Sequence, residues 1–321
     1  MSLYLTGMHH VSAVSHDIQA SHDFHTRVLG LQTLIKSVNQ DDTSMYHLFY
    51  GDGAGTAGSD LTVFDIPYAA RERRGNNSIT LTTLRIHGDD AFAYWADRFD
   101  AFGVPRGEIT TRDGRTVLDF EDVVGTLLSL VEDDGLLEAH PWDASPVPAE
   151  FQIRGLGYNI ITIPRLEPTH RFLTEALGLQ HDHTYPTPAA PQYSTHVYTI
   201  GAGGAHAEVH VSVRDDLPRA QPGSGGVHHL ALMVPQGQTM RDWVARLDAH
   251  GYRNSGVVDR HYFVSGYVRE PNHVLFELAT HDPGFTVDGP IDGEKLSLPP
   301  FLEPHRAQIE ARLKPLATAN V

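Results

Sequence analysis

The stretch SHDFHTRVLGLQ at residues 21–32 returns at residues 169–180 as THRFLTEALGLQ, with seven of the twelve positions identical. The same spacing of 148 residues aligns WADRFDAFG at 95–103 with WVARLDAHG at 243–251, where five of nine positions match. Two separate matches at one spacing indicate an internal duplication, which has to be recognised before any fold is predicted. We therefore expect two halves of similar structure.

Each half divides once more. A strand-like run leads into a stretch of helical periodicity, then into a glycine that ends the helix, then into further strand-like runs. We predict four strand-helix-strand-strand-strand modules, near residues 6–68, 76–133, 153–214 and 225–282. The corresponding division of the chain is an N-terminal half at 1–134, a proline-bearing linker at 135–152, a C-terminal half at 153–282, and a tail at 283–321 with one short helix near 303–313.

Composition excludes several classes of function. The 321 residues carry a net charge of −16, which argues against nucleic acid or an anionic membrane surface as a partner. With no cysteine, disulfides, thiolate metal sites and a cysteine nucleophile are excluded. The start of the chain has no signal-peptide pattern, and no stretch has the length of a membrane-spanning helix. We expect a cytoplasmic protein, and a homo-oligomer remains open.

Two His-His doublets are the strongest sign of chemistry. His9-His10 lies in GMHHVSAV, and His228-His229 lies 219 residues later in GVHHLALMV. Glu277, in the apolar run HVLFELAT, follows His229 by 48 residues. Two imidazoles and one carboxylate form the ligand set that holds ferrous iron on one face and leaves the other face open. Because neighbours on a strand point to opposite faces, one histidine of each doublet should bind; alternation does not say which.

The repeat supplies an internal control. A shift of 148 residues places Tyr158, Leu81 and Ser129 where the second histidine of each doublet and the glutamate stand. Modules two and three therefore lack the ligand set, and we predict one metal site, between modules one and four, with an empty counterpart in the other pair. The competing interpretation is that the doublets are ordinary core histidines. On that interpretation Glu277 forms an ion pair, since a carboxylate buried there without a metal or another cation would be costly.

These motifs resemble those of the vicinal oxygen chelate superfamily, and within it the hydroquinone ring-cleaving dioxygenases. His10-Val11-Ser12-Ala13-Val14 is similar to the segment that begins with a ligand histidine, and REPNHVLFE at 269–277 to the one that ends in the ligand glutamate. The resemblance covers nearly the whole chain. It implies an α+β fold whose four modules form two cup-shaped mixed β-sheet barrels with helices outside, and it assigns His10, His229 and Glu277 as metal ligands.

One position departs from the family pattern. His273 stands where the family has glycine in the turn before the final strand, whereas the corresponding position in the other half, Gly125, keeps it. Histidine tolerates left-handed backbone better than most residues. We therefore expect the strand that carries Glu277 to survive the change.

The resemblance also implies roles around the ligands. It places a catalytic arginine and tyrosine on Arg260 and Tyr267, in DRHYFVSGYVRE, and a small hydroxyl residue on Ser12. Tyr267 or a histidine would act as acid or base, and Arg260 would stabilise developing oxyanion charge. His9 and His228 are implied to be catalytic as well. Strand alternation would turn both away from the ion, so their approach to substrate follows from the resemblance alone.

The function implied is an Fe(II)-dependent extradiol-type dioxygenase that cleaves a hydroquinone-like or catechol-like ring with O2. Mn(II) accepts the same donors. Glyoxalase-like lyases of the superfamily use a fourth ligand, and its position in module one falls near Val63, which cannot bind a metal. Two alternatives stay open: a glyoxalase-like metal-dependent lyase or isomerase, and a non-catalytic protein that binds an aromatic compound between modules.

Overall fold

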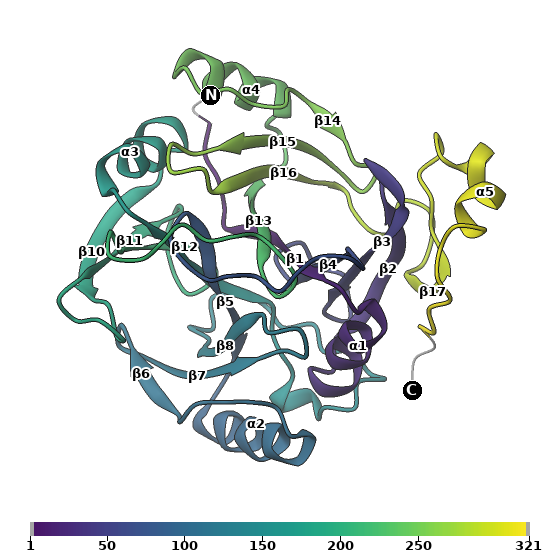
Figure 1. The fold of residues 1–321 in the computed structure, drawn as a ribbon, viewed down its shortest axis with the longest axis horizontal. Helices are drawn as coiled ribbons and strands as arrows, with labels where there is room; N and C mark the ends of the chain where they lie inside the picture. The colour runs from purple at the N-terminus through teal and green to yellow at the C-terminus, as the bar shows by residue number, and fades with distance from the viewer. Residues whose placement is uncertain (1–2, 319–321) are drawn as a thin grey trace.

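Each quarter of the chain folds as a strand, a helix and three further strands, in a computed structural model that describes residues 3–318 (Figure 1). The α+β architecture predicted from the sequence is confirmed. Module one comprises β1 (Met8–Ser15), α1 (Ile18–Asp23), η1 (Phe24–Val28), β2 (Gln32–Asn39), β3 (Asp42–Gly51) and β4 (Asp60–Asp65). Module two comprises β5 (Ser78–Ile86), α2 (Asp89–Phe102), β6 (Thr110–Arg112), β7 (Arg115–Glu121) and β8 (Leu127–Glu132).

The second half repeats this order after a short 3-10 turn, η2 (Ala149–Phe151). Module three comprises β9 (Leu156–Ile163), α3 (Leu166–Arg171), η3 (Phe172–Ala176), β10 (Gln180–Pro186), β11 (Ser194–Thr199) and β12 (Glu208–Val213). Module four comprises β13 (Val227–Val234), α4 (Met240–Ala249), β14 (Val258–Asp259), β15 (Phe263–Arg269) and β16 (Leu275–Pro283). No helix in residues 3–318 is long and apolar enough to cross a membrane.

The modules pair first with last and second with third. β1 pairs antiparallel with β13, and each of these strands also pairs in parallel with the last strand of its own module, β4 or β16. In the same way, β5 pairs antiparallel with β9. Each of these two strands also pairs in parallel with the last strand of its own module, β8 or β12. All of these strands belong to one 17-stranded sheet, whose two curved parts are called here the first cup (modules one and four) and the second cup (modules two and three). The helices lie outside both (Figure 1).

The repeated stretch forms the same unusual helix end in modules one and three. α1 and α3 each pass into a π-helical turn, η1 and η3, before a glycine with positive φ, Gly30 at 70° and Gly178 at 79°, ends the helix. The turn buries an aromatic residue, Phe24 or Phe172, in the core. This geometry accounts for the conserved spacing between the apolar residues and the glycine in both copies of the stretch.

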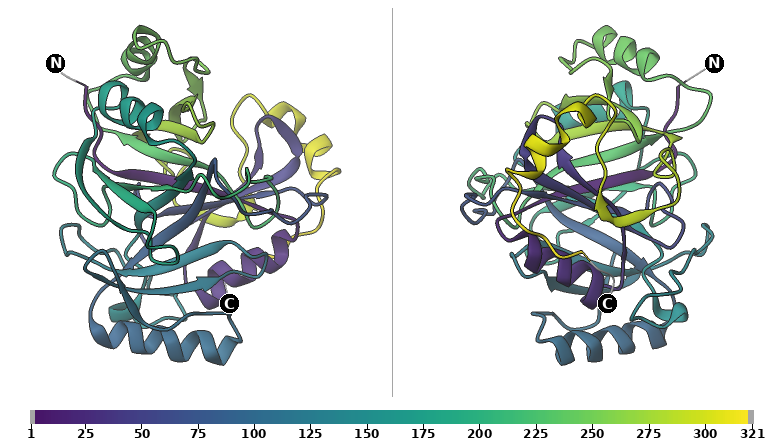
Figure 2. Two further views of the ribbon diagram at one scale, coloured as in Figure 1. Left: turned by 60° about the vertical axis from the view of Figure 1, so that its left-hand side comes forward. Right: turned by 90° about the vertical axis from the view of Figure 1, so that its right-hand side faces the viewer.

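The C-terminal segment lies against module one, beside β2 and β3 (Figure 2). Its strand β17 (Asp292–Leu296) pairs in parallel with β2, and the Tyr46 hydroxyl on β3 donates a hydrogen bond of 2.8 Å to the Lys314 carbonyl. A 3-10 turn, η4 (Glu303–His305), and a short helix, α5 (Arg306–Glu310), complete it. The segment thereby covers the strand β2, which would otherwise be the open edge of the first cup.

Candidate metal centre

Two β-bulges shape the centre of the first cup. Between β1 and β13, Met8 pairs with Leu232 but His10 with Ala231, so His9 is an extra residue on β1. A second shift, between the pairs Ser12–His229 and Ala13–Val227, makes His228 the extra residue on β13. A bulge re-aims side chains at the point where it interrupts the ladder. Each doublet therefore contains the bulged residue, and its first histidine lies behind the ligand ring, outside the pocket that the ligand histidines line.

The three expected ligands meet inside this cup. The Nε2 atoms of His10 and His229 are 3.1 Å apart, and Glu277 Oε2 lies 3.1 Å from the first and 2.9 Å from the second. Their exposed fractions are 2 %, 3 % and 0 %. Among residues 3–318 these are the one group of three histidine or carboxylate side chains arranged closely enough to hold an ion. The group can bind a metal.

The distances among the ligand atoms favour one coordination geometry. Three donors at 90° to one another, with bonds of about 2.1 Å as in octahedral sites, lie about 3.0 Å apart. Tetrahedral ligands at similar bond lengths lie about 3.4 Å apart. The observed values of 2.9 and 3.1 Å match three neighbouring corners of an octahedron. The residues present therefore fit a metal held on one face, with its other face directed to the pocket.

The outer nitrogens of the two ligand rings contact the first histidine of each doublet. His10 Nδ1 lies 2.9 Å from His9 Nδ1, and His229 Nδ1 lies 2.8 Å from His228 Nδ1. His9 Nε2 lies 3.1 Å from the carbonyl oxygen of Thr280 and donates to it. His9 Nδ1 then accepts the proton of His10 Nδ1, which leaves a lone pair on His10 Nε2, as metal binding requires. His9 thus fixes the tautomer of a ligand.

Electrostatics keep these groups in the forms that bind cations. Burial, followed by repulsion from His10, lowers the pKa of His9 to about 3, and burial with the neighbouring His229 lowers that of His228 to about 4. Both outer rings are therefore neutral at physiological pH. Although burial alone would raise it, His10 and His229 hold the pKa of Glu277 well below its usual 4.5.

The two carboxylate oxygens of Glu277 have different surroundings: a hydrogen bond to Oε1 orients the side chain, and Oε2 faces the other two ligands. The Ser265 hydroxyl, on the neighbouring strand β15, donates to Oε1. Oε2, which faces the two ligand nitrogens, accepts no hydrogen bond within the described part of the chain although it is fully buried. A buried carboxylate oxygen without a donor is expensive. A cation bound by Oε2 and the two ligand nitrogens would satisfy this oxygen.

A pocket opens over the ligand atoms. Its walls combine apolar rings with polar groups, and the set consists of His10, Asn39, Gln40, Asp41, His47, Phe49, Phe64, His229, Arg260, Phe263, Tyr267 and Glu277. Arg260 Nε donates to the Tyr267 hydroxyl oxygen at 3.0 Å, and its Nη2 pairs with Asp41 at 3.1 Å. The structure therefore brings Arg260 and Tyr267 together with the three ligands. His9 and His228 lie behind the ligands, outside these walls.

Module one contributes pocket residues that the sequence did not indicate. His47 on β3 stacks on Phe64 with ring centroids 4.0 Å apart, and its Nε2 lies 2.9 Å from Thr62 Oγ1. His47 stands alone in an ordinary strand, so only the alternation of β3 could have pointed to it.

The register also corrects the expected fourth-ligand position. On β13, Ala231, two residues after the ligand, pairs with Glu277; on β1, Ser12 pairs in the same way with Thr62, not Val63.

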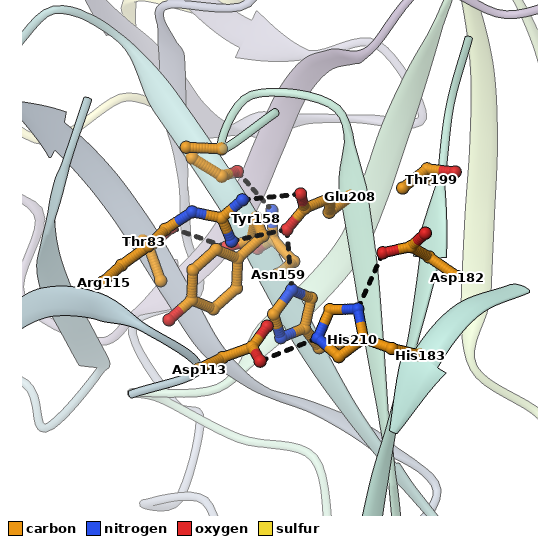
Figure 3. A network of polar contacts seen from close by, with 12 residues as sticks. Thr83, Asp113, Arg115, Tyr158, Asn159, Asp182, His183, Thr199, Glu208 and His210 are labelled. Atoms are coloured by element: carbon orange, nitrogen blue, oxygen red, sulfur yellow. Dashed lines mark hydrogen bonds and ion pairs between the residues drawn. The ribbon is translucent and has the colours of Figure 1, made fainter. Parts of the chain in front are cut away.

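The second cup is filled by its own side chains (Figure 3). Tyr158, which replaces the ligand histidine, stacks on His210 with centroids 4.0 Å apart and planes at 6°. Glu208 accepts two hydrogen bonds of 2.7 Å from Arg115 and contacts His210 Nε2 at 3.0 Å. Despite burial, which raises it, these partners lower the pKa of Glu208 to about 2. Where the first cup offers ligands to a cation, the second supplies its own cation, Arg115.

His273 adopts the backbone expected of it. Its φ is 70°, in the left-handed region, and the turn that it shares with Glu270 precedes an intact β16. The corresponding Gly125 has a φ of 92°. The substitution of histidine for glycine therefore leaves the strand that carries Glu277 in place.

Comparison with known proteins supports this description. The Glyoxalase/Bleomycin resistance protein/Dioxygenase superfamily matches residues 155–278. MhqA of Bacillus subtilis strain 168, whose assigned name is that of a ring-cleaving dioxygenase, is 44 % identical over 97 % of this chain and 99 % of its own length. The chlorohydroquinone/hydroquinone 1,2-dioxygenase of Sphingobium indicum is 28 % identical, with 92 % of each chain covered.

Solved structures agree. A crystal structure from Bacillus subtilis, described as that of a dioxygenase, superposes with a TM-score of 0.89 at 31 % identity and covers 100 % of both chains. Glyoxalase I from Zea mays has a TM-score of 0.63 at 12 % identity, covers 86 % of this chain and 92 % of its own, and shows the shared fold alone. The chain therefore belongs to the glyoxalase/bleomycin resistance protein/dioxygenase superfamily, and within it to the ring-cleaving dioxygenases.

Proposed function

We propose that this protein is an Fe(II)-dependent extradiol-type dioxygenase that cleaves the ring of a hydroquinone-like substrate with O2; catechols are the second substrate class. His10, His229 and Glu277 would hold the iron. The observation that carries the proposal is the mutual spacing of their three donor atoms, 2.9 to 3.1 Å, beneath an open pocket. Mn(II) fits the same donors. The hydroquinone class is supported by the Sphingobium indicum relative, which is named for that substrate.

When bound, the metal supplies the redox chemistry with O2 and the positive charge that favours ionisation of a phenolic hydroxyl. The protein supplies the rest. Phe49, Phe64 and Phe263 give the pocket apolar walls suited to an aromatic ring. Arg260, at the same pocket, is a permanent cation that can stabilise negative charge on a substrate oxygen.

Tyr267 is the acid that the geometry favours. Its oxygen accepts the hydrogen bond from Arg260 Nε, so its own hydrogen is free to point into the pocket. Burial and then the charge of Glu277 raise the pKa of Tyr267 above its usual 10, so the hydroxyl keeps its proton at neutral pH. A positioned, protonated hydroxyl of this kind can donate to an oxygen on the substrate. His9 and His228 enter the proposal as positioning residues, because their Nδ1 atoms contact the ligand rings.

The glyoxalase-like alternative receives less support from the site. A lyase of that type completes its set with a second carboxylate, and the corresponding position here is Thr62. Three protein ligands leave more of the metal free for substrate and O2 than four would. Consumption of O2 distinguishes the dioxygenase from both the lyase and a non-catalytic binding protein.

The test is anaerobic loading with Fe(II), followed by measurement of O2 uptake with a small panel of hydroquinones and catechols. Ala at position 10, 229 or 277 is expected to abolish both iron content and O2 uptake. His183→Ala is the matched control, because the His183 ring contacts Asp182 and Asp113, each at 2.7 Å, in the second cup and lies outside the metal site. Retention of iron and activity by Glu277→Ala would show that the ligand assignment is wrong.

A further inference from the structure

A second cavity, called here the side cavity, lies beside the substrate pocket and is lined by other residues. His229 lines the substrate pocket, whereas His228 lines the side cavity, together with residues of β5, β15 and β16 and of the loop before β13. Arg219 and Arg269 line it as well, and both are exposed to solvent. Its apolar wall consists of Val14, Ile79, Val227, Val274 and Leu275. The side cavity thus combines two cations with a hydrocarbon surface.

The corresponding place in the second cup contains an acid. Glu121 Oε2 lies 3.5 Å from Arg71 Nη2 and 3.1 Å from Arg74 Nη2, so one carboxylate pairs with two guanidinium groups. The shift of 148 residues that relates the two halves turns Arg71 into Arg219 and Glu121 into Arg269. The first cup therefore has an arginine where the second cup has the neutralising acid.

The backbone confirms that these positions correspond. Glu121 pairs with Leu127 between the last two strands of module two, and Arg269 pairs with Leu275 in the same register of module four. The loop before β5 and the loop before β13 are bridged at positions 71 and 224 and at positions 76 and 219, and the shift of 148 exchanges the two bridges. The reversal of charge is therefore a difference in side chains on equivalent backbone.

No acidic side chain compensates for this reversal. Arg269 Nη1 donates to the carbonyl oxygen of His273 at 3.0 Å, and neither Arg219 nor Arg269 forms an ion pair with a carboxylate in residues 3–318. Glu72 is the acidic residue among those that line the side cavity. Burial, opposed by the charge of Arg74, raises the pKa of Glu72 to about 7, so its carboxyl group is partly protonated at neutral pH. Two guanidinium groups without a counter-ion attract an anion.

His273 explains why this place stays open in the first cup. In the second cup Arg71 packs over Gly125, and a Cβ atom on that glycine would lie 2.7 Å from Arg71 Nη2. A histidine at the corresponding position excludes the same packing for Arg219. The side cavity is also lined by two non-glycine residues in the left-handed region, His273 with a φ of 70° and Asn77 with a φ of 61°. Such strained residues concentrate at ligand sites.

We propose that the side cavity binds an unsaturated organic acid, the class of molecule that ring cleavage produces. Arg219 and Arg269 hold the carboxylate, and the apolar wall covers the carbon chain. The identification of the acid as a product rests on the function proposed above, because insertion of both oxygen atoms beside a hydroxylated ring carbon leaves that carbon as a carboxylic acid. The anion site itself rests on the reversal of charge between the two copies of the repeat.

The experiment titrates full-length protein loaded with Zn(II) with trans,trans-muconate, a stable unsaturated dicarboxylate, in a calorimeter. Arg269→Glu places an acid beside Arg219, as Glu121 stands beside Arg71, and is expected to weaken binding by about tenfold or more. Arg253→Glu makes the same change of charge at an exposed position outside the side cavity and is expected to leave the affinity unchanged. Thermal melts verify that both variants fold.

Two further titrations locate the site and identify the class of ligand. Arg260→Ala removes the cation of the substrate pocket and should leave muconate binding unchanged; a loss would place the muconate in that pocket and overturn the inference. Inorganic phosphate, which cannot cover the apolar wall, should bind about tenfold or more weakly than muconate, and equal binding would overturn the assignment to organic acids.

The charge reversal gives the decisive result. Absence of muconate binding to the wild-type protein, or wild-type affinity in Arg269→Glu, would overturn the side cavity as an anion site. Neither outcome bears on O2 uptake by the iron-loaded protein, which tests the dioxygenase proposal separately.

Discussion

Replacing His9 by leucine tests how the first histidine of each doublet acts on the metal. The variant removes the acceptor 2.9 Å from His10 Nδ1 and the donor to the Thr280 carbonyl. His10 can then move its proton to Nε2, where it would donate to Glu277 Oε2, 3.1 Å away. An incoming metal must break that bond between a donor and a charged acceptor, which costs about 1.5–3 kcal/mol. The expected loss of metal affinity is therefore about 10- to 100-fold.

The assay is competition for Zn(II) or Mn(II) between the protein and a chelating dye, combined with a thermal melt to verify folding. His47→Phe is the control, since His47 contacts no ligand nitrogen among those described and should leave the metal affinity unchanged. His228→Leu should reproduce the effect through His229. If His9→Leu bound the metal as tightly as the wild-type protein, the tautomer argument would be refuted.

Three further outcomes are expected. Tyr267→Phe should lower the rate of O2 uptake by about 10²- to 10⁴-fold, with the iron content of the purified protein unchanged; loss of iron would instead make Tyr267 a structural support of the site. Glu208 has a folded-state pKa of about 2 against its usual 4.5, so it contributes stability that is present above pH 4.5 and lost as pH falls towards 2. Glu208→Gln should therefore lower the free energy of unfolding by about 3 kcal/mol at neutral pH and flatten its decline in acid, as measured by urea unfolding at several pH values. Mn(II) at about 100 times its dissociation constant should raise the free energy of unfolding by about 2.7 kcal/mol, and Glu277→Ala should abolish the rise in a thermal melt.

The fold was predictable because the sequence contains its own repeat. The copy of residues 21–32 at 169–180 indicated the duplication, and the buried aromatic and terminal glycine of each copy stand in the same turns of the structure. The three candidate ligands also lie together as expected. Their motifs are local, and each carries its residue on a strand that the hydrophobic pattern identifies.

The details that failed depend on pairing between distant strands. The bulges at His9 and His228 exist only in the register of β1 with β13, so the contacts of both rings with the ligand histidines could not be predicted from alternation along one strand. The shift from Val63 to Thr62 has the same origin, since only the pairing of β1 with β4 defines the corresponding position. His47 comes from a strand with no ligand motif, and its approach to Thr62 follows from the register of β3 with β4.

The second cup has two β-bulges between its central strands, β5 and β9, although it carries no metal ligands. Thr80 is an extra residue on β5, and β9 has one between Asn159 and Leu156. The backbone that aims two imidazoles at one point therefore does not depend on the imidazoles. For a designer who wants a binuclear or two-centre version of this scaffold, the peptide frame is already in place. The remaining work is to exchange side chains and to remove the guanidinium that now occupies the centre.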